Sequence, residues 1–163
     1  MTLRITLLLL LAVTLTACGY HLRGSNLTAL KNSRVYIKSG GASELALQVR
    51  RKLEFSDVVV IRDAAEADYI IELGLDSFKR SVLSVSAETG KVEEYEITYD
   101  TTLTINGPNG QVLLKTEPIT AQRDYTFAED SVLGKFDEEN KLHDELTRHA
   151  ADMVLRRLQA VTR

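Results

Sequence analysis

The chain has 163 residues, with 20 lysines and arginines against 23 aspartates and glutamates and a formal net charge of −3. This acidic balance argues against a general nucleic-acid-binding protein, which usually presents a basic stripe. The single cysteine excludes an internal disulfide, and two prolines with no low-complexity tract give no sign of an interdomain linker. The length suits one domain, which can bury roughly 68–70% of its unfolded surface without a metal.

An apolar segment opens the chain. Arg4 precedes a run over 5–15 that only threonines interrupt. The run is too short for a transmembrane helix, which needs about 20 apolar residues, and has the length typical of a secretory signal. Residues 15–19 (LTACG) then resemble the bacterial lipobox, in which a signal peptidase cleaves before a lipid-modified cysteine. The alternative is an ordinary secretory signal with an incidental cysteine.

We expect Cys18 to become the mature N-terminus and to carry an S-diacylglycerol group and an N-acyl chain. Two or more acyl chains hold a protein stably at a membrane, because each buried methylene contributes about 0.8 kcal/mol. Gly19 is not aspartate, which by resemblance to enteric lipoproteins implies the periplasmic face of the outer membrane. The predicted domains are a signal peptide at 1–17 and one periplasmic domain at 18–163; removing 17 residues from 163 leaves 146.

A strand and a helix follow a polar loop over 24–33. Residues 34–38 are rich in β-branched and aromatic side chains, which favours a short strand. Leu45, Val49 and Leu53 recur at the spacing of one helical face and predict an amphipathic helix that begins near Ser43. The apolar run 58–61 indicates a brief further strand.

From residue 69 the apolar period changes to two. Residues 69–76 alternate, with Leu75 predicted on the same side as Leu73, and this pattern predicts a half-buried strand. Val82 and Val85 favour its continuation. Residues 88–91 (ETGK) then predict a hairpin tip, because glycine adopts a positive φ without strain.

Two long strands and a helix complete the predicted domain. Alternation over 95–105 places one set of side chains toward a core: Tyr95, Ile97, Tyr99, Leu103 and Ile105. A turn at 106–110 (NGPNG) leads to a strand over 112–127, in which Pro118 predicts an edge position or a bulge. These strands exceed the usual length, so we expect hairpins that project beyond the core. A polar connection over 128–136 precedes a long amphipathic helix.

The predicted fold class is α+β, a two-layer sandwich with two helices packed on one face of a mainly antiparallel sheet of about four strands. Antiparallel strands bury one face and leave the other free. The open face carries Thr98, Thr102 and Thr104, so it is polar enough for water or for the wall of a larger protein.

Residues 18–24 (CGYHLRG) resemble the opening of mature proteins of the LPS-assembly lipoprotein family LptE. The order of elements is similar along the mature chain, and residues 87–99 resemble the long middle hairpin of that family. The resemblance implies a non-enzymatic binding protein without a cofactor. It implies a place inside the outer-membrane β-barrel LptD, which such proteins plug and help to fold, and contact with lipopolysaccharide on its way to the surface.

The resemblance also implies roles for individual residues. Lys135, in the loop before the last helix, and Lys91, at the hairpin tip, are the expected lipopolysaccharide contacts. Lys91 lies three residues beyond Glu88, where the family arginine aligns, so the family pattern is shifted here. Tyr95 in the middle hairpin is the expected partner contact. Charge-assisted hydrogen bonds from the lysines to phosphate would be the mechanism.

Two other functions remain open. A pilotin-like lipoprotein that escorts a secretin would share the anchor. The protein that co-purifies, a secretin or LptD, distinguishes these two functions. A hydrolase of envelope glycan would need two carboxylates placed about 5–10 Å apart, and the run 93–96 contains Glu93, Glu94 and Glu96.

No nucleotide-binding or nucleophile motif is present. His143 and His149 are six residues apart, which is not the spacing of two metal ligands on one helix face, so no metal site is predicted.

Overall fold

The computed structural model describes residues 27–126 and 135–162. Its strands are β1 (Arg34–Ser39), β2 (Val59–Ile61), β3 (Tyr69–Leu73), β4 (Ser77–Val85), β5 (Val92–Asn106) and β6 (Val112–Thr126), and its helices are α2 (Ser43–Phe55) and α3 (Lys135–Val161). Short 3₁₀ turns lie at Thr28–Leu30 (η1), Ala64–Glu66 (η2) and Pro108–Gly110 (η3). Cys18 and the predicted signal peptide lie outside the described residues.

The six strands form one sheet in the order β2-β1-β3-β5-β4, with β6 along the other edge of β5. The prediction of about four strands is therefore too low. β1 pairs in parallel with β2 and with β3, and the remaining pairs are antiparallel. β5 is long enough to pair with β3 near its end, where Leu73 lies opposite Leu103, and with β4 nearer its start, where Phe78 lies opposite Tyr99.

The predicted strand from residue 69 is interrupted. From Leu73 to Ser77 the chain advances four residues, while the facing stretch of β5 from Leu103 to Asp100 advances three. One extra residue reverses which side chains face the core, because side chains alternate along a strand. Placing Leu75 on the buried side was therefore wrong: this side chain is 76% exposed in the break.

Both helices pack against the same face of the sheet, as predicted. Leu45, Val49 and Leu53 of α2 are fully buried, and the apolar stripe of α3 joins the same core. Of the side chains of β5 that the alternation predicted to be buried, Ile97, Tyr99, Leu103 and Ile105 are buried and Tyr95 is half-buried. Thr101, on the same side but not in the predicted set, is also buried. The two helices also contact each other, so one apolar core lies between the sheet and a single helical layer.

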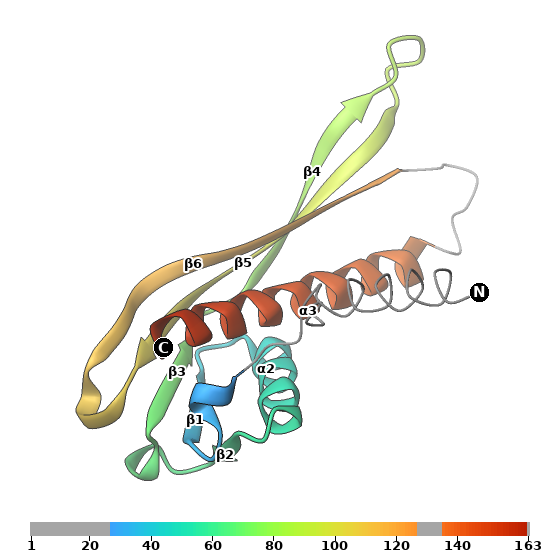
Figure 1. Ribbon diagram of the computed structural model, residues 1–163. Coiled ribbons are helices and arrows are strands. Elements are labelled where there is room, and N and C mark those ends of the chain that lie inside the picture. The colour runs from blue at the N-terminus through green and yellow to red at the C-terminus, as the bar shows by residue number, and fades with distance from the viewer. Residues whose placement is uncertain (1–26, 127–134, 163) are drawn as a thin grey trace, which may run out of the picture.

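The molecule is elongated (Figure 1). The hairpin of β4 and β5 extends far beyond α2 and the short strands, and α3 runs beside β5 and β6. We call the part built from β1, β2, β3, α2, the end of α3, the stretch of β5 that pairs with β3 and the part of β6 opposite it the body. The part that holds β4 and the facing ends of β5 and β6 is the projecting half. Within the described residues, no helix has the length and apolar character required to cross a membrane.

Candidate binding surfaces of the projecting half

The tip of the β4–β5 hairpin is formed by the turn that the sequence predicted. The Ser86 N–H donates to the Lys91 carbonyl at 2.8 Å, and the Gly90 N–H donates to the Ser86 carbonyl at 2.9 Å. Gly90 has a φ of 68°, which a residue without Cβ adopts at little cost. Lys91 is exposed on this turn, so the structure places it at the extreme of the projecting half, where a large ligand can reach it.

A cluster around Arg80 lies on the helix-facing side below the tip. The Arg80 guanidinium carbon is 4.9 Å from the centre of the Tyr95 ring, and Tyr95 stacks on Tyr125 of β6 with ring centres 5.7 Å apart. Arg80 also lies 3.5 Å from a carboxylate oxygen of Glu139 on α3. Hydrogen bonding to Tyr125 raises the pKa of Arg80 above its usual value, and a guanidinium is in any case always protonated in proteins. Arg80 thus joins three strands to the first turns of α3.

Tyr95, the predicted partner contact, belongs to this cluster. Its ring is half-buried, and Arg80 and Tyr125 occupy parts of its surface. The structure therefore gives Tyr95 a packing role, which the sequence prediction did not include.

A second aromatic group lies next to the Arg80 cluster, toward the body. Phe78 stacks on His143 of α3 with ring centres 4.0 Å apart, and it packs at a tilt of 57° against Tyr99 of β5 with ring centres 4.8 Å apart. The Tyr99 hydroxyl donates to an Asp76 carboxylate oxygen at 3.1 Å, and burial followed by the charge of Asp76 raises the pKa of Tyr99. His143 is thus engaged with an aromatic ring.

The sequence prediction missed Phe78 and Arg80 because it treated β4 as a continuation of the strand before it. A signal for them was present. Phe78, Arg80 and Val82 alternate with polar residues, and this period-two pattern marks one side of a new strand. In the structure all three lie opposite helix-facing residues of β5.

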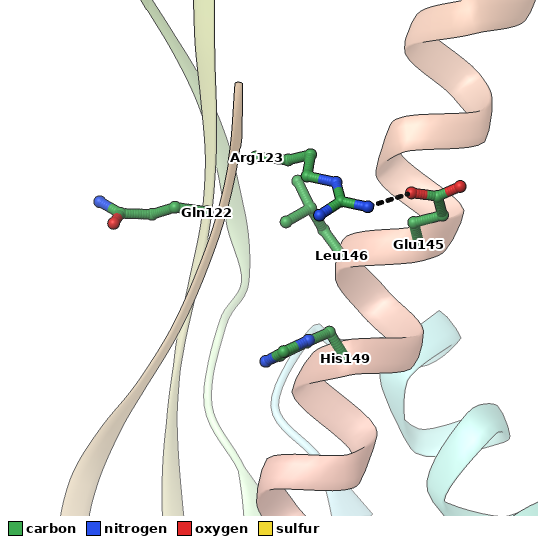
Figure 2. Close-up of a pocket in the computed structure, with 5 residues that line it drawn as sticks. All are labelled: Gln122, Arg123, Glu145, Leu146 and His149. Atoms are coloured by element: carbon green, nitrogen blue, oxygen red, sulfur yellow. Dashed lines mark ion pairs between the residues drawn. The ribbon is translucent and has the colours of Figure 1, made fainter. Parts of the chain in front are cut away.

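A surface cavity of about 190 Å³ lies between β6 and α3. Figure 2 shows Arg123 and His149 lying between the strand and the helix, while Gln122 points to the other side of β6. Arg123 pairs with Glu145 across the cavity at 3.6 Å. His149 therefore lies in a different environment from the stacked His143. The described parts of the chain contain no group of three or more His, Cys, Asp or Glu residues placed to hold a metal ion.

The opposite face of the sheet is polar, and neither α2 nor α3 packs on it. Thr104 and Thr116 are hydrogen-bonded at 2.9 Å across β5 and β6, and Thr120 donates to Asp100 at 2.7 Å. Two of the three carboxylates considered for a hydrolase lie here, because Glu93 alternates to the other side of β5. Glu94 accepts from Ser84 at 2.8 Å and Glu96 accepts from Thr98 at 3.4 Å. We call this the outer sheet face. The cross-strand hydrogen bonds of this face give partners to Thr104, Thr116, Thr120, Asp100, Ser84 and Glu94.

Lys135 is the first residue of α3. The predicted helix start, after Phe136, was therefore late by two residues, and Lys135 does not belong to the preceding loop. Its side chain, like Cys18, lies outside what the structure describes. The lipopolysaccharide contacts predicted at Lys91 and Lys135 thus remain predictions, with Lys91 located at the tip and Lys135 at the start of the long helix.

The protein belongs to the class of small α+β domains in which a long hairpin and a long helix extend from a compact body. The family model described as "LptE: Lipopolysaccharide-assembly" matches residues 32–158. The chain belongs to this family. The match contains the body, the projecting hairpin and most of α3, so it confirms the resemblance seen at residues 18–24 on a separate part of the chain.

Individual relatives and solved structures are consistent with the family match. The chain is 31% identical to the LPS-assembly lipoprotein LptE of Pectobacterium atrosepticum, over 96% of this chain and 85% of the relative, and 29% identical to that of Photorhabdus laumondii, over 96% and 86%. Among solved structures it resembles rare lipoprotein B of Shewanella oneidensis, with a TM-score of 0.68, 28% identity and coverage of 78% and 94%. It also resembles a lipoprotein B of Nitrosomonas europaea, with a TM-score of 0.72, 25% identity and coverage of 88% and 92%.

Proposed function

We propose that this chain is a non-enzymatic, lipid-anchored component of lipopolysaccharide assembly at the outer membrane. It acts as the partner of an LptD-like β-barrel and contacts lipopolysaccharide on the way to the cell surface. The observation that carries the proposal is the family match over residues 32–158. The relatives that match nearly the whole chain are named LPS-assembly lipoproteins.

The anchor in this proposal is Cys18. Signal peptidase removes 1–17, and the acylated cysteine holds a single domain, 18–163, at the periplasmic face of the outer membrane. The lipobox-like sequence at 15–19 supports the cleavage. Leu27 and Leu30 already belong to the core, so at most nine residues, 18–26, lie between the proposed anchor and the described part of the chain.

The outer sheet face supports the proposed place inside a barrel. The interior of a transmembrane β-barrel is polar, and a plug needs a polar surface to face it. The threonine-rich face, with pairs such as Thr104–Thr116 and Thr120–Asp100, has this character. Tyr95 contributes to the partner surface with the part of its ring that Arg80 and Tyr125 leave exposed.

Lipopolysaccharide is contacted at the projecting end, by Lys91 at the hairpin tip and by Lys135 at the start of α3. An ammonium group forms short, strong hydrogen bonds with phosphate oxygens. The exposure of Lys91 on a turn supports its part of the proposal.

The test is co-purification of the natively acylated protein from envelopes in mild detergent, combined with depletion in the source cell. We expect a large β-barrel protein to co-purify and surface lipopolysaccharide to fall on depletion. A Cys18→Ser variant, which cannot be acylated, serves as the control for membrane attachment. Recovery of a secretin ring would instead support the pilotin-like function, and undiminished lipopolysaccharide delivery after depletion would contradict the proposal.

A further inference from the structure

Phe55, the last residue of α2, is 93% exposed, more than any other large apolar side chain among the described residues. It stands at a surface hollow of about 340 Å³ between α2 and α3. The hollow is lined by Phe55 together with Arg51, Lys52, Ser56, Asp152 and Leu155. An aromatic ring in this position gains nothing from the core of its own domain.

The two basic residues beside Phe55 differ in whether they form an ion pair. Lys52 is neutralised by Asp152 at 2.7 Å, whereas Arg51 makes no ion pair with any described residue and is exposed. Arg51 lies one helical turn before Phe55, and Leu47, which is also exposed, lies one turn earlier. Residues four apart share a helix face. This stripe of α2 therefore presents an aromatic ring, an unpaired cation and a leucine to the outside.

The described chain begins at the same end of the molecule. The Asn32 N–H donates to the carbonyl of Asp57, two residues after Phe55, at 3.3 Å, and Lys31 pairs with the Asp57 carboxylate at 3.7 Å. Leu27 and Leu30 are buried in the same core as Val58. The first described residues therefore lie in the body, with Lys31 and Asn32 beside the end of α2.

The length of that segment limits how far this end can lie from the anchor. Nine residues, 18–26, precede Leu27, and nine extended residues span at most about 30 Å. An acylated Cys18 thus keeps the first described residues, and the body that contains them, within about 30 Å of the bilayer that holds the acyl chains. Phenylalanine, leucine and arginine are among the side chains that are typical of segments lying in the membrane interface.

We propose that Phe55 and Arg51 form a second contact with the phospholipid surface, beside the lipid anchor. Phe55 enters the interface between headgroups and acyl chains, and Arg51 donates to phosphate oxygens of the lipids. A single point of attachment leaves the domain free to rotate, whereas two points of attachment fix which end lies at the bilayer. In the elongated molecule this is the body, and the hairpin tip lies at the opposite end (Figure 1). The inference rests on the proposed acylation of Cys18.

The chain has no tryptophan, which allows a direct test in the full acylated protein. Phe55→Trp introduces a single indole at the patch. Leu75→Trp, at a side chain that is also strongly exposed but lies in the break between β3 and β4, is the matched control. Each variant is reconstituted in vesicles of phosphatidylethanolamine and phosphatidylglycerol, with and without brominated lipids that quench indole fluorescence at known depth.

We expect the emission of Phe55→Trp to shift to shorter wavelength in vesicles and its quenching to exceed that of Leu75→Trp by about twofold or more, as burial in the interface requires. Adding Arg51→Glu to Phe55→Trp should reduce the quenching. Equal quenching of the two indoles would overturn the inference, as would a shift that appears only when a barrel partner is added, because the patch would then be a protein interface.

Mass spectrometry of the same samples separates this inference from the proposed function. An unmodified Cys18 contradicts the anchor and the inference together. Acylated Cys18 with unquenched Phe55→Trp overturns the membrane contact alone and leaves the anchor in place.

Discussion

The body and the projecting half share β5 and β6 but are stabilised in different ways. In the body, apolar side chains such as Leu53 and Leu103 are fully buried. In the projecting half, apolar side chains of β4 such as Val82 and Val85 remain more than half exposed, and contacts of Arg80 and Phe78 join the strands to α3. Apolar burial supplies most folding free energy, so the body should hold the fold while the projecting half opens at lower cost.

The largest expected effect comes from removing a buried side chain of the body. Leu103→Ala should lower the free energy of unfolding by about 3 kcal/mol, since a fully buried leucine leaves a cavity. Val82→Ala is the matched change in the projecting half and should cost less than about 1 kcal/mol, because Val82 is 54% exposed. Urea unfolding of the mature chain measures both. Equal losses would remove the distinction between the two regions.

The next effect concerns binding and should appear only at the projecting end. Lys135→Asp should weaken lipopolysaccharide binding by about tenfold, the size of one charge-assisted contact, without changing the unfolding midpoint. Lys115→Asp, an exposed lysine on β6 nearer the body, should leave the affinity unchanged. Lys91→Asp tests the tip in the same assay. Unchanged affinity in Lys135→Asp would remove this residue from the site.

A smaller effect should follow from loosening the projecting half. Arg80→Gln loses the contact with the Tyr95 ring and the ion pair with Glu139, together about 1 kcal/mol. Hydrogen exchange should become faster at amides of β4 and the facing part of β5 and stay unchanged in β1. Lys79→Gln, the neighbouring exposed position, is the control. Uniformly faster exchange would show that the two regions open together.

The smallest effect is a pH dependence in the body. The Arg34 N–H, at 2.8 Å, and the Arg34 guanidinium lower the pKa of the Asp68 carboxyl. The ionised carboxylate therefore stabilises the folded chain at neutral pH, and this contribution is lost as the pH falls below about 4 and through the lowered pKa. Asp68→Asn should be slightly less stable at pH 7, and the difference should shrink toward pH 3 in thermal unfolding. A difference that grew in acid would contradict this assignment.

Local patterns were sufficient to predict much of this fold. The alternation over 95–105 identified the buried side of β5, and the spacing of Leu45, Val49 and Leu53 identified the buried face of α2, because both patterns follow from side-chain geometry within one element. The parallel pairing of β1 with β2 and β3 could not be predicted, since it depends on contacts between strands far apart in sequence. The extra residue between Leu73 and Ser77 does leave a local mark, because the alternating set moves from odd positions in β3 to even positions in β4. The prediction overlooked this shift, which changes which side of β4 faces the helix.

The candidate site shows the same division. The tip was predicted because Gly90 lies in a short polar turn between two alternating stretches. The cluster around Arg80 was missed, because it forms only where β4, β5, β6 and the start of α3 meet. The start of α3 at Lys135 was misplaced by two residues, and helix ends are where local preferences are weakest.

Among the described residues β6 pairs with β5 alone, so one side of this fifteen-residue strand offers unpaired backbone groups to its surroundings. Such an edge can recruit a strand from another copy and start aggregation. Pro118, which has no N–H to donate, sits near the middle of β6, and charged Lys115, Glu117 and Asp124 flank it. These residues discourage self-association, and they would keep newly exported molecules apart until each meets its own partner.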